Sequence, residues 1–225
     1  MADNYLERRF EEHERQSYAA RRKSPIPKQR KVLFVGALNE VGVAVVRAVR
    51  AAGHRIATCS STDEPSLGVH HHINIDNYNI ENLRRATDEC IEQLGGIDII
   101  IYNYYKIIDN ENVNDIADGV RDAVAALLVP SRKMIQIYKD NGEKRFGRIV
   151  CISELTSSNI NIYENIINGA LSSAIKALAD EAGESGITAN SLTLSGKATS
   201  ADVARISRFI IDEANGYLTG RNIEI

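Results

Sequence analysis

The feature that most constrains this chain is a series of short, almost wholly apolar runs that alternate with helical patterns. The clearest runs are Val32–Val35 and Ile97–Tyr102, and strands are also expected at Arg148–Ser153 and Ile187–Leu194. A strand that is apolar at nearly every position is buried on both faces, which is typical of a parallel sheet covered by helices on both sides. The alternation therefore predicts an α/β fold with a doubly wound parallel sheet in three α/β/α layers.

The same alternation places the remaining elements. Further strands are expected at 55–59, 69–75 and 222–225, and helices at 41–52, 80–94, 113–139, 164–182 and 202–214. Pro130 predicts a kink in the long helix, because proline removes one backbone hydrogen bond. Thr199 or Ser200 is expected to cap the last helix.

The first 30 residues differ from the rest of the chain. Residues 4–23 are dominated by charges, with acidic residues early and basic residues late, an order that suits the dipole of an exposed helix. Pro25 and Pro27 are expected to end it. We expect a charged helical arm over 1–30 that packs loosely on its own domain or on a neighbouring subunit, and one α/β domain over 31–225. A specific partner-binding helix is the alternative.

Composition narrows the classes of partner and compartment. The formal net charge is −3, which argues against bulk attraction to nucleic acid or to an anionic membrane. The three cysteines, Cys59, Cys90 and Cys151, form no CxxC pair and are odd in number, as is typical of a reducing compartment. No apolar run approaches the ~20 residues of a membrane span. These features predict a cytoplasmic protein that binds neither nucleic acid nor membrane.

Several strings resemble the short-chain dehydrogenase/reductase family over about residues 31–225. They are VLFVGALNEVGVAVVRAV, GGIDIIIYNYY, GRIVCIS, GALSSAIKALADEAGESGITANSLTLSG and ADVARISRFIIDEANGYLTGRNIEI. In that family these segments are strands, turns and helices of an NAD(P)-binding Rossmann fold. The resemblance therefore implies that fold, while function requires each site to be read separately.

The glycine turn of the family is kept only in part. Gly36 and Gly42 match the outer glycines of its Thr-Gly-x-x-x-Gly-x-Gly pattern, and Glu40 replaces the middle one. A carboxylate there adds bulk and negative charge where a pyrophosphate binds, although it also suits a helix N-terminus. The resemblance places vestigial cofactor contacts at Gly36, Ala37, Leu38, Val41, Gly42, Ser60 and Asn103.

The nucleoside end of such a site is altered as well. The second strand ends in Thr58–Ser61, which offers no acid to select NAD and no arginine to select NADP. Tyr104 and Tyr105 replace small residues and are expected to crowd the ribose and nicotinamide positions. No cofactor is therefore expected, and NAD or NADP is the cofactor if the crevice still functions.

The catalytic set implied by the resemblance is missing. Glu164 falls at the position of the family's tyrosine, Asn168 at that of its lysine, and Glu154 at that of its serine. The position of its asparagine falls near Ala123 or Val124. Only a few residues, 196–200, separate the sixth strand from the last helix, where the family has a substrate lid.

Three other chemistries compete with a non-catalytic interpretation. Tyr163, or Tyr105 with Lys106, are the candidates for an atypical NAD(P)-dependent oxidoreductase. Glu154 and Glu164 could share a proton in hydrolysis. The residues His70–His72 suggest a metal cluster, but no neighbouring cysteine or carboxylate completes a site, so no metal is expected.

The leading hypothesis is a non-catalytic binding or assembly subunit, and a small-ligand sensor is a further alternative. Helices 113–139 and 164–182 carry more apolar residues than one core-facing stripe requires. In the family such helices form two-fold contacts between subunits, so the resemblance implies a homo-oligomer, dimer or tetramer, or a hetero-oligomer with a related subunit. Ala174, if it faces outward, would lie in that contact.

Overall fold

The structure is a computed structural model that describes residues 29–62, 67–104, 112–142, 146–154, 162–194, 199–211 and 216–225. The predicted N-terminal arm lies outside these ranges. None of the described helices has the length and apolar character that crossing a membrane requires.

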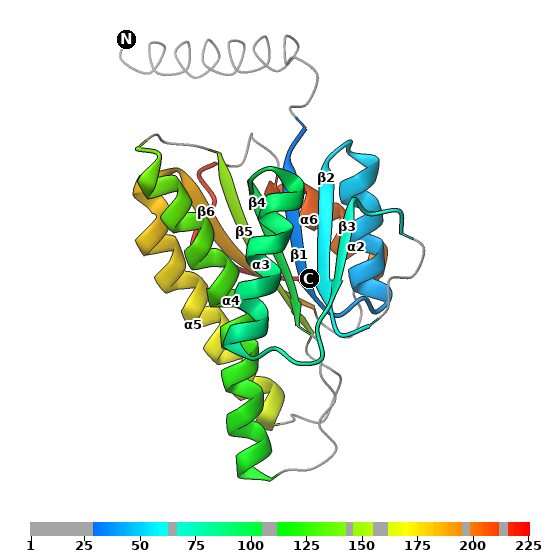
Figure 1. Cartoon of the computed structure of the whole chain (residues 1–225). Helices are drawn as coiled ribbons and strands as arrows, with labels where there is room; N and C mark the ends of the chain where they lie inside the picture. Colours follow the sequence, from blue (N-terminus) through cyan, green and yellow to red (C-terminus); the bar gives the residue numbers. More distant parts are fainter. Residues whose placement is uncertain are drawn as a thin grey trace, which may run out of the picture.

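A seven-stranded sheet forms the centre of the described part of the chain (Figure 1). Its strands are β1 (Lys31–Gly36), β2 (Arg55–Ser60), β3 (His71–Asn74), β4 (Ile99–Tyr104), β5 (Gly147–Glu154), β6 (Ile187–Leu194) and β7 (Asn222–Glu224). Their order is β3-β2-β1-β4-β5-β6-β7, and every neighbouring pair is parallel. The chain winds outward in both directions from β1, which confirms the predicted doubly wound sheet and creates a switch point between β1 and β4.

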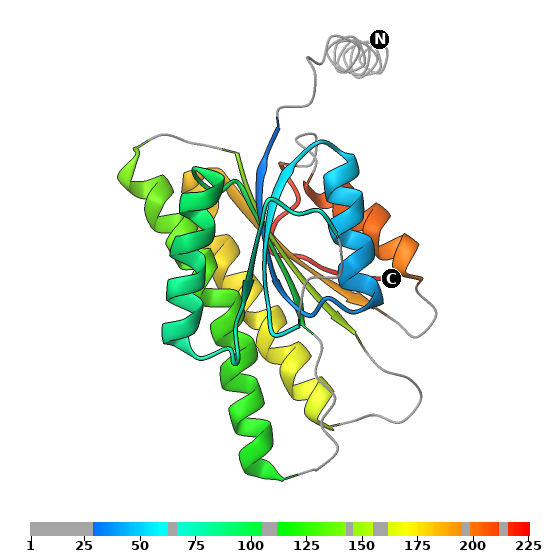
Figure 2. The same cartoon turned by 45° about the vertical axis from the view of Figure 1, so that its right-hand side comes forward.

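Helices cover both faces of this sheet (Figure 2). They are α2 (Glu40–Ala51), α3 (Ile80–Leu94), α4 (Val113–Asp140), α5 (Ile162–Ala182) and α6 (Ser200–Ile211), with a short 3₁₀ turn, η1 (Gly183–Ser185), after α5. Helices α2 and α6 pack side by side on one face, and α3, α4 and α5 pack on the other. The result is the predicted three-layer α/β/α arrangement.

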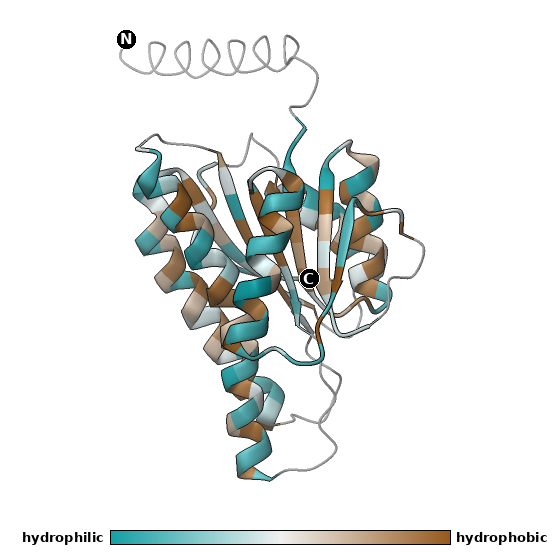
Figure 3. Ribbon diagram, in the orientation of Figure 1, coloured by the Kyte–Doolittle hydropathy of each residue, from teal (hydrophilic) through white to brown (hydrophobic). Residues whose placement is uncertain are grey.

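The first strand shows why the apolar runs predicted this arrangement. Val32 and Phe34 point into the cluster beneath α2 and α6, whereas Leu33 and Val35 point into the cluster beneath α3, α4 and α5. All four are essentially inaccessible to solvent. Successive side chains of a strand alternate between faces, so a strand covered on both sides must be apolar throughout. Figure 3 shows the same concentration of apolar residues in the strands.

The ends of the elements differ from the prediction only locally. The third strand is limited to His71–Asn74, and β4 continues two residues further than expected, to Tyr104. Helix α4 runs through Pro130 as one helix. Thr199 is the residue that caps α6, because its Oγ1 accepts from the Asp202 backbone N–H at 3.2 Å and donates to the Asp202 carboxylate at 2.7 Å.

Candidate functional site

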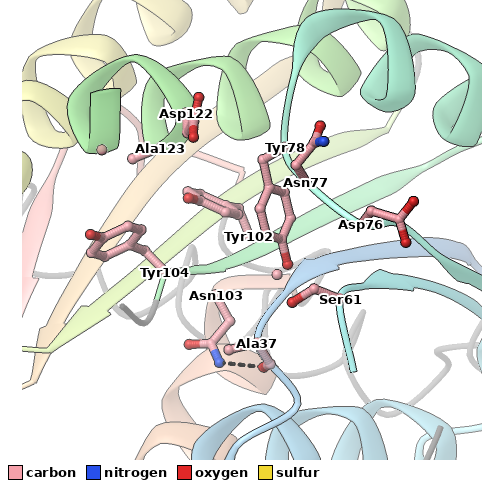
Figure 4. A pocket seen from close by; sticks show the side chains of 12 residues that line it. Ala37, Ser61, Asp76, Asn77, Tyr78, Tyr102, Asn103, Tyr104, Asp122 and Ala123 are labelled. Atoms are coloured by element: carbon pink, nitrogen blue, oxygen red, sulfur yellow. Dashed lines mark hydrogen bonds between the residues drawn. The ribbon is translucent and has the colours of Figure 1, made fainter. Parts of the chain in front are cut away.

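A cleft opens at the carboxyl ends of β1, β2 and β4, at the switch point of the sheet. Ligands of doubly wound folds bind at such a point. The cleft encloses about 300 Å³. It is lined by Gly36, Ala37, Ser61, Asp76, Asn77, Tyr78, Tyr102, Asn103, Tyr104, Gly119, Asp122 and Ala123 (Figure 4).

The glycine turn between β1 and α2 forms the floor of the cleft and is tightly packed. Gly36 has φ +109°, and a Cβ atom there would lie 2.2 Å from the carbonyl oxygen of Asn103. A Cβ atom on Gly42 would lie 2.2 Å from the carbonyl oxygen of Ala37. Both positions therefore exclude a side chain, as the sequence comparison of the turn implied.

Asn103 fastens this turn to the end of β4. Its side-chain Nδ2 donates to the Ala37 carbonyl at 2.8 Å and to Asn39 Oδ1 at 3.0 Å (Figure 4). The Asn39 oxygen also accepts from the Gly42 backbone N–H at 3.0 Å and caps α2. Asn103, expected as a vestigial cofactor contact, thus also joins the end of β4 to the glycine turn.

Glu40 is the residue that departs from the family's turn. It is exposed in the first turn of α2, and its Oε1 accepts a hydrogen bond from Ser200 Oγ at 3.0 Å. The carboxylate therefore joins the N-terminus of α2 to the N-terminus of α6, two places where anions are favoured. Leu38 and Val41, also expected at the cofactor, pack with their side chains on the apolar cluster beneath these helices.

The nucleoside end of the cleft is occupied by a tyrosine that the sequence analysis did not identify. Ser60 is buried at the end of β2, and its Oγ lies 2.9 Å from Thr62 Oγ1. Tyr78 extends from the connection between β3 and α3 toward Ser61, and its hydroxyl interacts with Ser61 and Ser60 (Figure 4). Burial raises the pKa of Tyr78. Its ring thus lies across the end of β2.

Two further tyrosines meet on the opposite side of the cleft. The hydroxyl groups of Tyr104 and Tyr163 are 2.6 Å apart, and the rings of Tyr102 and Tyr104 are 6.4 Å apart at an interplanar angle of 59°. Tyr163 is only 2% exposed. A Cβ atom on Gly119 would lie 2.3 Å from its hydroxyl oxygen, so the missing side chain on α4 makes room for this ring.

The surroundings of this hydroxyl pair oppose ionisation. Burial raises the pKa of Tyr104, and the bond to Tyr163 and the charge of Glu164 act in the same direction. Burial also raises the pKa of Tyr163; its bond to Tyr104 lowers that pKa, and the charge of Asp122 raises it. The charges of Glu164 and Asp122 thus act with burial against ionisation of the pair.

The other residues at family catalytic positions are dispersed. Glu164 and Asn168 lie on α5 and do not belong to the lining of the cleft, and the Asn168 Nδ2 is buried without a hydrogen-bond partner in the described structure. Ala123 lines the cleft, whereas Val124 faces a groove between α3 and α4. The side chain of Glu154, and the residues Tyr105 and Lys106, lie outside the described part of the chain.

The three consecutive histidines have separate partners. The His70 Nδ1 accepts from the Ile56 backbone N–H at 3.3 Å, His71 Nε2 lies 2.9 Å from Glu89 Oε1, and His72 Nδ1 lies 2.8 Å from Thr58 Oγ1. Among the described residues no group of three histidines, cysteines or carboxylates could hold a metal ion.

Several cleft residues were missed in the sequence analysis. Asp76 and Asn77 directly follow the third strand, and the carboxyl ends of parallel strands meet at one edge of a sheet, so their position was a usable signal. Asp122 and Gly119 lie in the middle of a helix. Nothing in the local sequence distinguishes them from an exposed acid and a weak helix former.

Comparisons with known proteins find similarity in structure and none in sequence. No family model and no curated protein matches the sequence. A short-chain dehydrogenase from Mycobacterium smegmatis superposes with a TM-score of 0.75 at 15% identity, covering 89% of this chain and 93% of that one. A double mutant of the Serratia marcescens short-chain dehydrogenase/reductase gives 0.73 at 19% identity, with 88% and 97% covered. A Leptospira borgpetersenii short-chain dehydrogenase with bound NAD⁺ gives 0.73 at 16% identity, with 88% and 91% covered.

The chain has the Rossmann-like α/β fold of these short-chain dehydrogenases. At these identities the likeness concerns the fold, so the fit of a dinucleotide must be judged from the cleft itself. The glycine turn keeps the close backbone packing that such a ligand requires. However, Tyr78 lies across the nucleoside end, and Glu40 places a negative charge beside the turn. Tyr78 and Glu40 therefore count against a dinucleotide in this cleft, whereas the glycine turn at its floor favours one.

Proposed function

We propose that this chain is a non-catalytic protein with the short-chain dehydrogenase/reductase fold, acting as a binding or assembly subunit. The observation that carries the proposal is the hydroxyl pair of Tyr104 and Tyr163, 2.6 Å apart, with the pKa of each raised by burial and by a nearby carboxylate, Glu164 or Asp122. A tyrosine that exchanges protons with a substrate near neutral pH needs its pKa lowered from ~10. Here the pKa values move in the opposite direction.

Turnover measurements test this proposal directly. The purified protein is incubated with NADH or NADPH and a panel of aldehydes and ketones, and with NAD⁺ or NADP⁺ and secondary alcohols. We expect no turnover above the rate without protein. Turnover that Tyr163→Phe abolishes, and that Tyr217→Phe leaves intact, would show an atypical oxidoreductase instead. Tyr217 is a suitable control because it is 99% exposed.

A second candidate function, dinucleotide binding without the usual catalytic set, is favoured by the glycine turn. The backbone of the glycine turn is held close to the N-terminus of α2 by the packing of Gly36 and Gly42 and by the hydrogen bond from Asn103. Backbone N–H groups at a helix N-terminus attract phosphates. One structural neighbour is described with bound NAD⁺. When bound, NAD or NADP would supply hydride chemistry, and this chain's part would be to hold its phosphates at the turn.

Titration separates the two candidates. NADH and NADPH are titrated calorimetrically into the unmodified protein, Glu40→Gly and Tyr78→Ala. The leading proposal expects weak or absent binding by the unmodified protein, and improved binding when either obstacle is removed. A dissociation constant in the low micromolar range for the unmodified protein would favour the second candidate.

The assembly part of the proposal rests on the outer surfaces of α4 and α5. On α5, an exposed face carries two large apolar residues, Ile162 (58% exposed) and Ile166 (43% exposed), followed by the small residues Gly169, Ser173 and Ala177. On α4, the half-buried Val120, Val124 and Leu128 line a groove of about 680 Å³ beside α3. Small residues beside apolar ones allow another helix to approach closely, as in an isologous dimer contact.

Light scattering tests the assembly. We expect a dimer or larger oligomer, whose interface buries more than ~1,000 Å². Ala174, considered from the sequence, is half-buried and packs on the core, so Ile166→Glu is the better disrupting change. It should release monomers, whereas Arg47→Glu on the exposed surface of α2 should not. A monomeric unmodified protein at micromolar concentration would contradict self-association, and a hetero-oligomer with a related subunit would then be tested by co-purification.

A further inference from the structure

Residues 1–28 join the α/β domain at Gln29 and Arg30, beside the turn between α2 and β2. Gln29 Nε2 donates to the Gly53 carbonyl at 3.1 Å, and the Arg30 backbone N–H donates to His54 Nδ1 at 3.2 Å. Both hydrogen bonds cross from the segment before β1 to this turn. The turn therefore holds the point at which the N-terminal residues are attached.

The bond to His54 depends on the protonation state of the imidazole. A neutral imidazole has one donor and one acceptor nitrogen, and both nitrogens are donors once it is protonated. Because Nδ1 accepts from Arg30, His54 is neutral here and carries its proton on Nε2. Protonation would set an N–H on Nδ1 against the Arg30 N–H. Arg30 is 8% exposed, so water compensates for the lost bond only in part.

The charged groups that act on His54 come from three other elements. Partial burial lowers the pKa of His54, and the guanidinium groups of Arg30, before β1, and of Arg208, on α6, act in the same direction. The carboxylate of Asp98, directly before β4, raises that pKa. The neutral form therefore predominates at pH 7, and the contact with Arg30 is formed.

The strand itself is fastened by other bonds. The Lys31 backbone N–H donates to the Asp98 carboxylate at 2.9 Å, and the Arg55 backbone N–H donates to the Arg30 carbonyl at 2.8 Å. From Lys31 onward β1 is paired with β2, and from Val32 onward also with β4. Val32 is fully buried. Loss of the His54 contact would thus loosen the segment before β1 and leave the sheet intact.

We propose that His54 is an acid-sensitive switch at the attachment point of residues 1–28. Neutral His54 holds the segment before β1, and protonation of its Nδ1 releases that segment. A lowered pKa in the attached form means that the released form binds protons more readily. Release should therefore increase as pH falls below the ordinary histidine value of ~6.5, and level off below the lowered value of the attached form. The switch lies at the amino ends of the strands, away from the cleft, so it does not depend on the proposed function.

NMR spectroscopy of the full chain tests the switch at the atoms involved. A coupling through the hydrogen bond between Arg30 N and His54 Nδ1 should be present at about pH 7.5 and absent at about pH 5. The hydrogen-exchange protection factor of the Arg30 amide should fall about fivefold to tenfold over the same range, the usual worth of one hydrogen bond. Its midpoint should match the titration of the His54 ring. An unchanged protection factor, or a different midpoint, overturns the inference.

A conservative variant separates titration from structure. His54→Asn places an amide oxygen where it can accept from Arg30 and does not titrate, so protection of the Arg30 amide should be the same at both pH values. His54→Ala should lower it about equally at both. His70→Asn is the matched control, because His70 Nδ1 also accepts a backbone N–H, from Ile56 at 3.3 Å, away from the attachment point. Persistence of the pH dependence in His54→Asn, or its loss in His70→Asn, overturns the inference.

The surrounding charges provide a test that leaves His54 in place. Arg208→Gln removes a cation and should move the ring titration and the Arg30 transition together to higher pH. Asp98→Asn keeps an acceptor but removes the negative charge, and should move both to lower pH. Arg205→Gln, on the same helix as Arg208 but not among the groups that act on His54, should move neither. A ring titration that moves without the Arg30 transition would show that His54 does not control the contact.

Discussion

The two sides of the cleft differ in how far their residues match the family's pattern. On the β1 side, the glycine turn keeps its close contacts, with Gly36 and Gly42 each leaving no space for a Cβ atom. On the β4 and α5 side, Tyr104 and Tyr163 bond to each other, and we propose that the family's catalytic residues are replaced there. The turn has the close packing of the family's pattern, whereas the opposite wall is proposed to lack its catalytic chemistry.

The difference shows which constraints belong to the fold and which to the reaction. Gly36 and Gly42 lie against backbone carbonyls, so a larger residue would force β1, α2 and β4 apart whether or not a cofactor binds. A catalytic tyrosine or lysine projects into open space and has no such packing role. Glycines at these positions are therefore weak evidence for cofactor binding. Four experiments test the difference between the glycine turn and the opposite wall of the cleft.

The largest effect is expected in the turn. Gly42→Ala should lower the free energy of unfolding by about 3 kcal/mol, because the new Cβ meets the Ala37 carbonyl. Gly183→Ala is the matched control: it lies in the 3₁₀ turn η1, outside the proposed subunit contact, has open space around it, and should change stability by less than ~1 kcal/mol. Urea denaturation of both variants measures the difference. Equal effects would mean that the turn is not constrained by packing.

A smaller effect is expected at the residue that links the two sides. Asn103→Ala removes the donor to the Ala37 carbonyl and to Asn39 Oδ1, and should cost about 2 kcal/mol. Asn82→Ala, at an exposed side-chain hydrogen bond on α3, should cost less than ~0.5 kcal/mol. Urea denaturation again measures the free energy of unfolding of both variants. A similar loss in both would mean that the hydrogen bonds of Asn103 do not hold the glycine turn to β4.

The tyrosine pair is expected to be worth about 1 kcal/mol. Tyr104→Phe and Tyr163→Phe should each lower the free energy of unfolding by 1–2 kcal/mol, since each leaves the other hydroxyl without this partner. The double variant should cost less than the sum of the two, with a coupling energy of about 1 kcal/mol. Additive losses would mean that the hydroxyl groups do not stabilise one another.

The smallest effect is a dependence on alkaline pH. Burial holds the pKa of Tyr104 and of Tyr163 above the usual value, so the unfolded chain loses these protons first as pH rises. The free energy of unfolding should be constant with respect to these groups below about pH 10 and fall above it. Tyr163→Phe should flatten this decline by less than ~1 kcal/mol between pH 9 and 11. An unchanged slope would contradict the burial of its hydroxyl.

The sequence predicted the fold well because burial on two faces leaves a strong signal. Val32–Val35 had to be apolar on both sides, and the same holds for Ile99–Tyr102 in β4. The four-residue β3 was the poorest match, because an edge strand carrying His71 and His72 lacks that signal. Edge strands are half-covered and tolerate polar residues.

The candidate site was less predictable because it depends on tertiary packing. The glycine turn and Asn103 were found, since their residue types are tied to backbone geometry. The direction of Tyr163 was not, because it depends on the space left by Gly119 on another helix. Tyr78 and Asp122 reach the cleft from separate elements. No local pattern brings such residues together.

The position of β1 has a consequence for synthesis. This strand is made first among the seven, yet its neighbours are β2 and β4, and β4 begins only at Ile99. At typical translation rates, on the order of ten seconds pass between the synthesis of Val32–Val35 and the synthesis of β4, which pairs with it. During that interval an apolar strand edge is open to other nascent chains and to chaperones. Pairing over such a sequence separation is also slow to form, so refolding yield should be limited by this step and should fall as protein concentration rises.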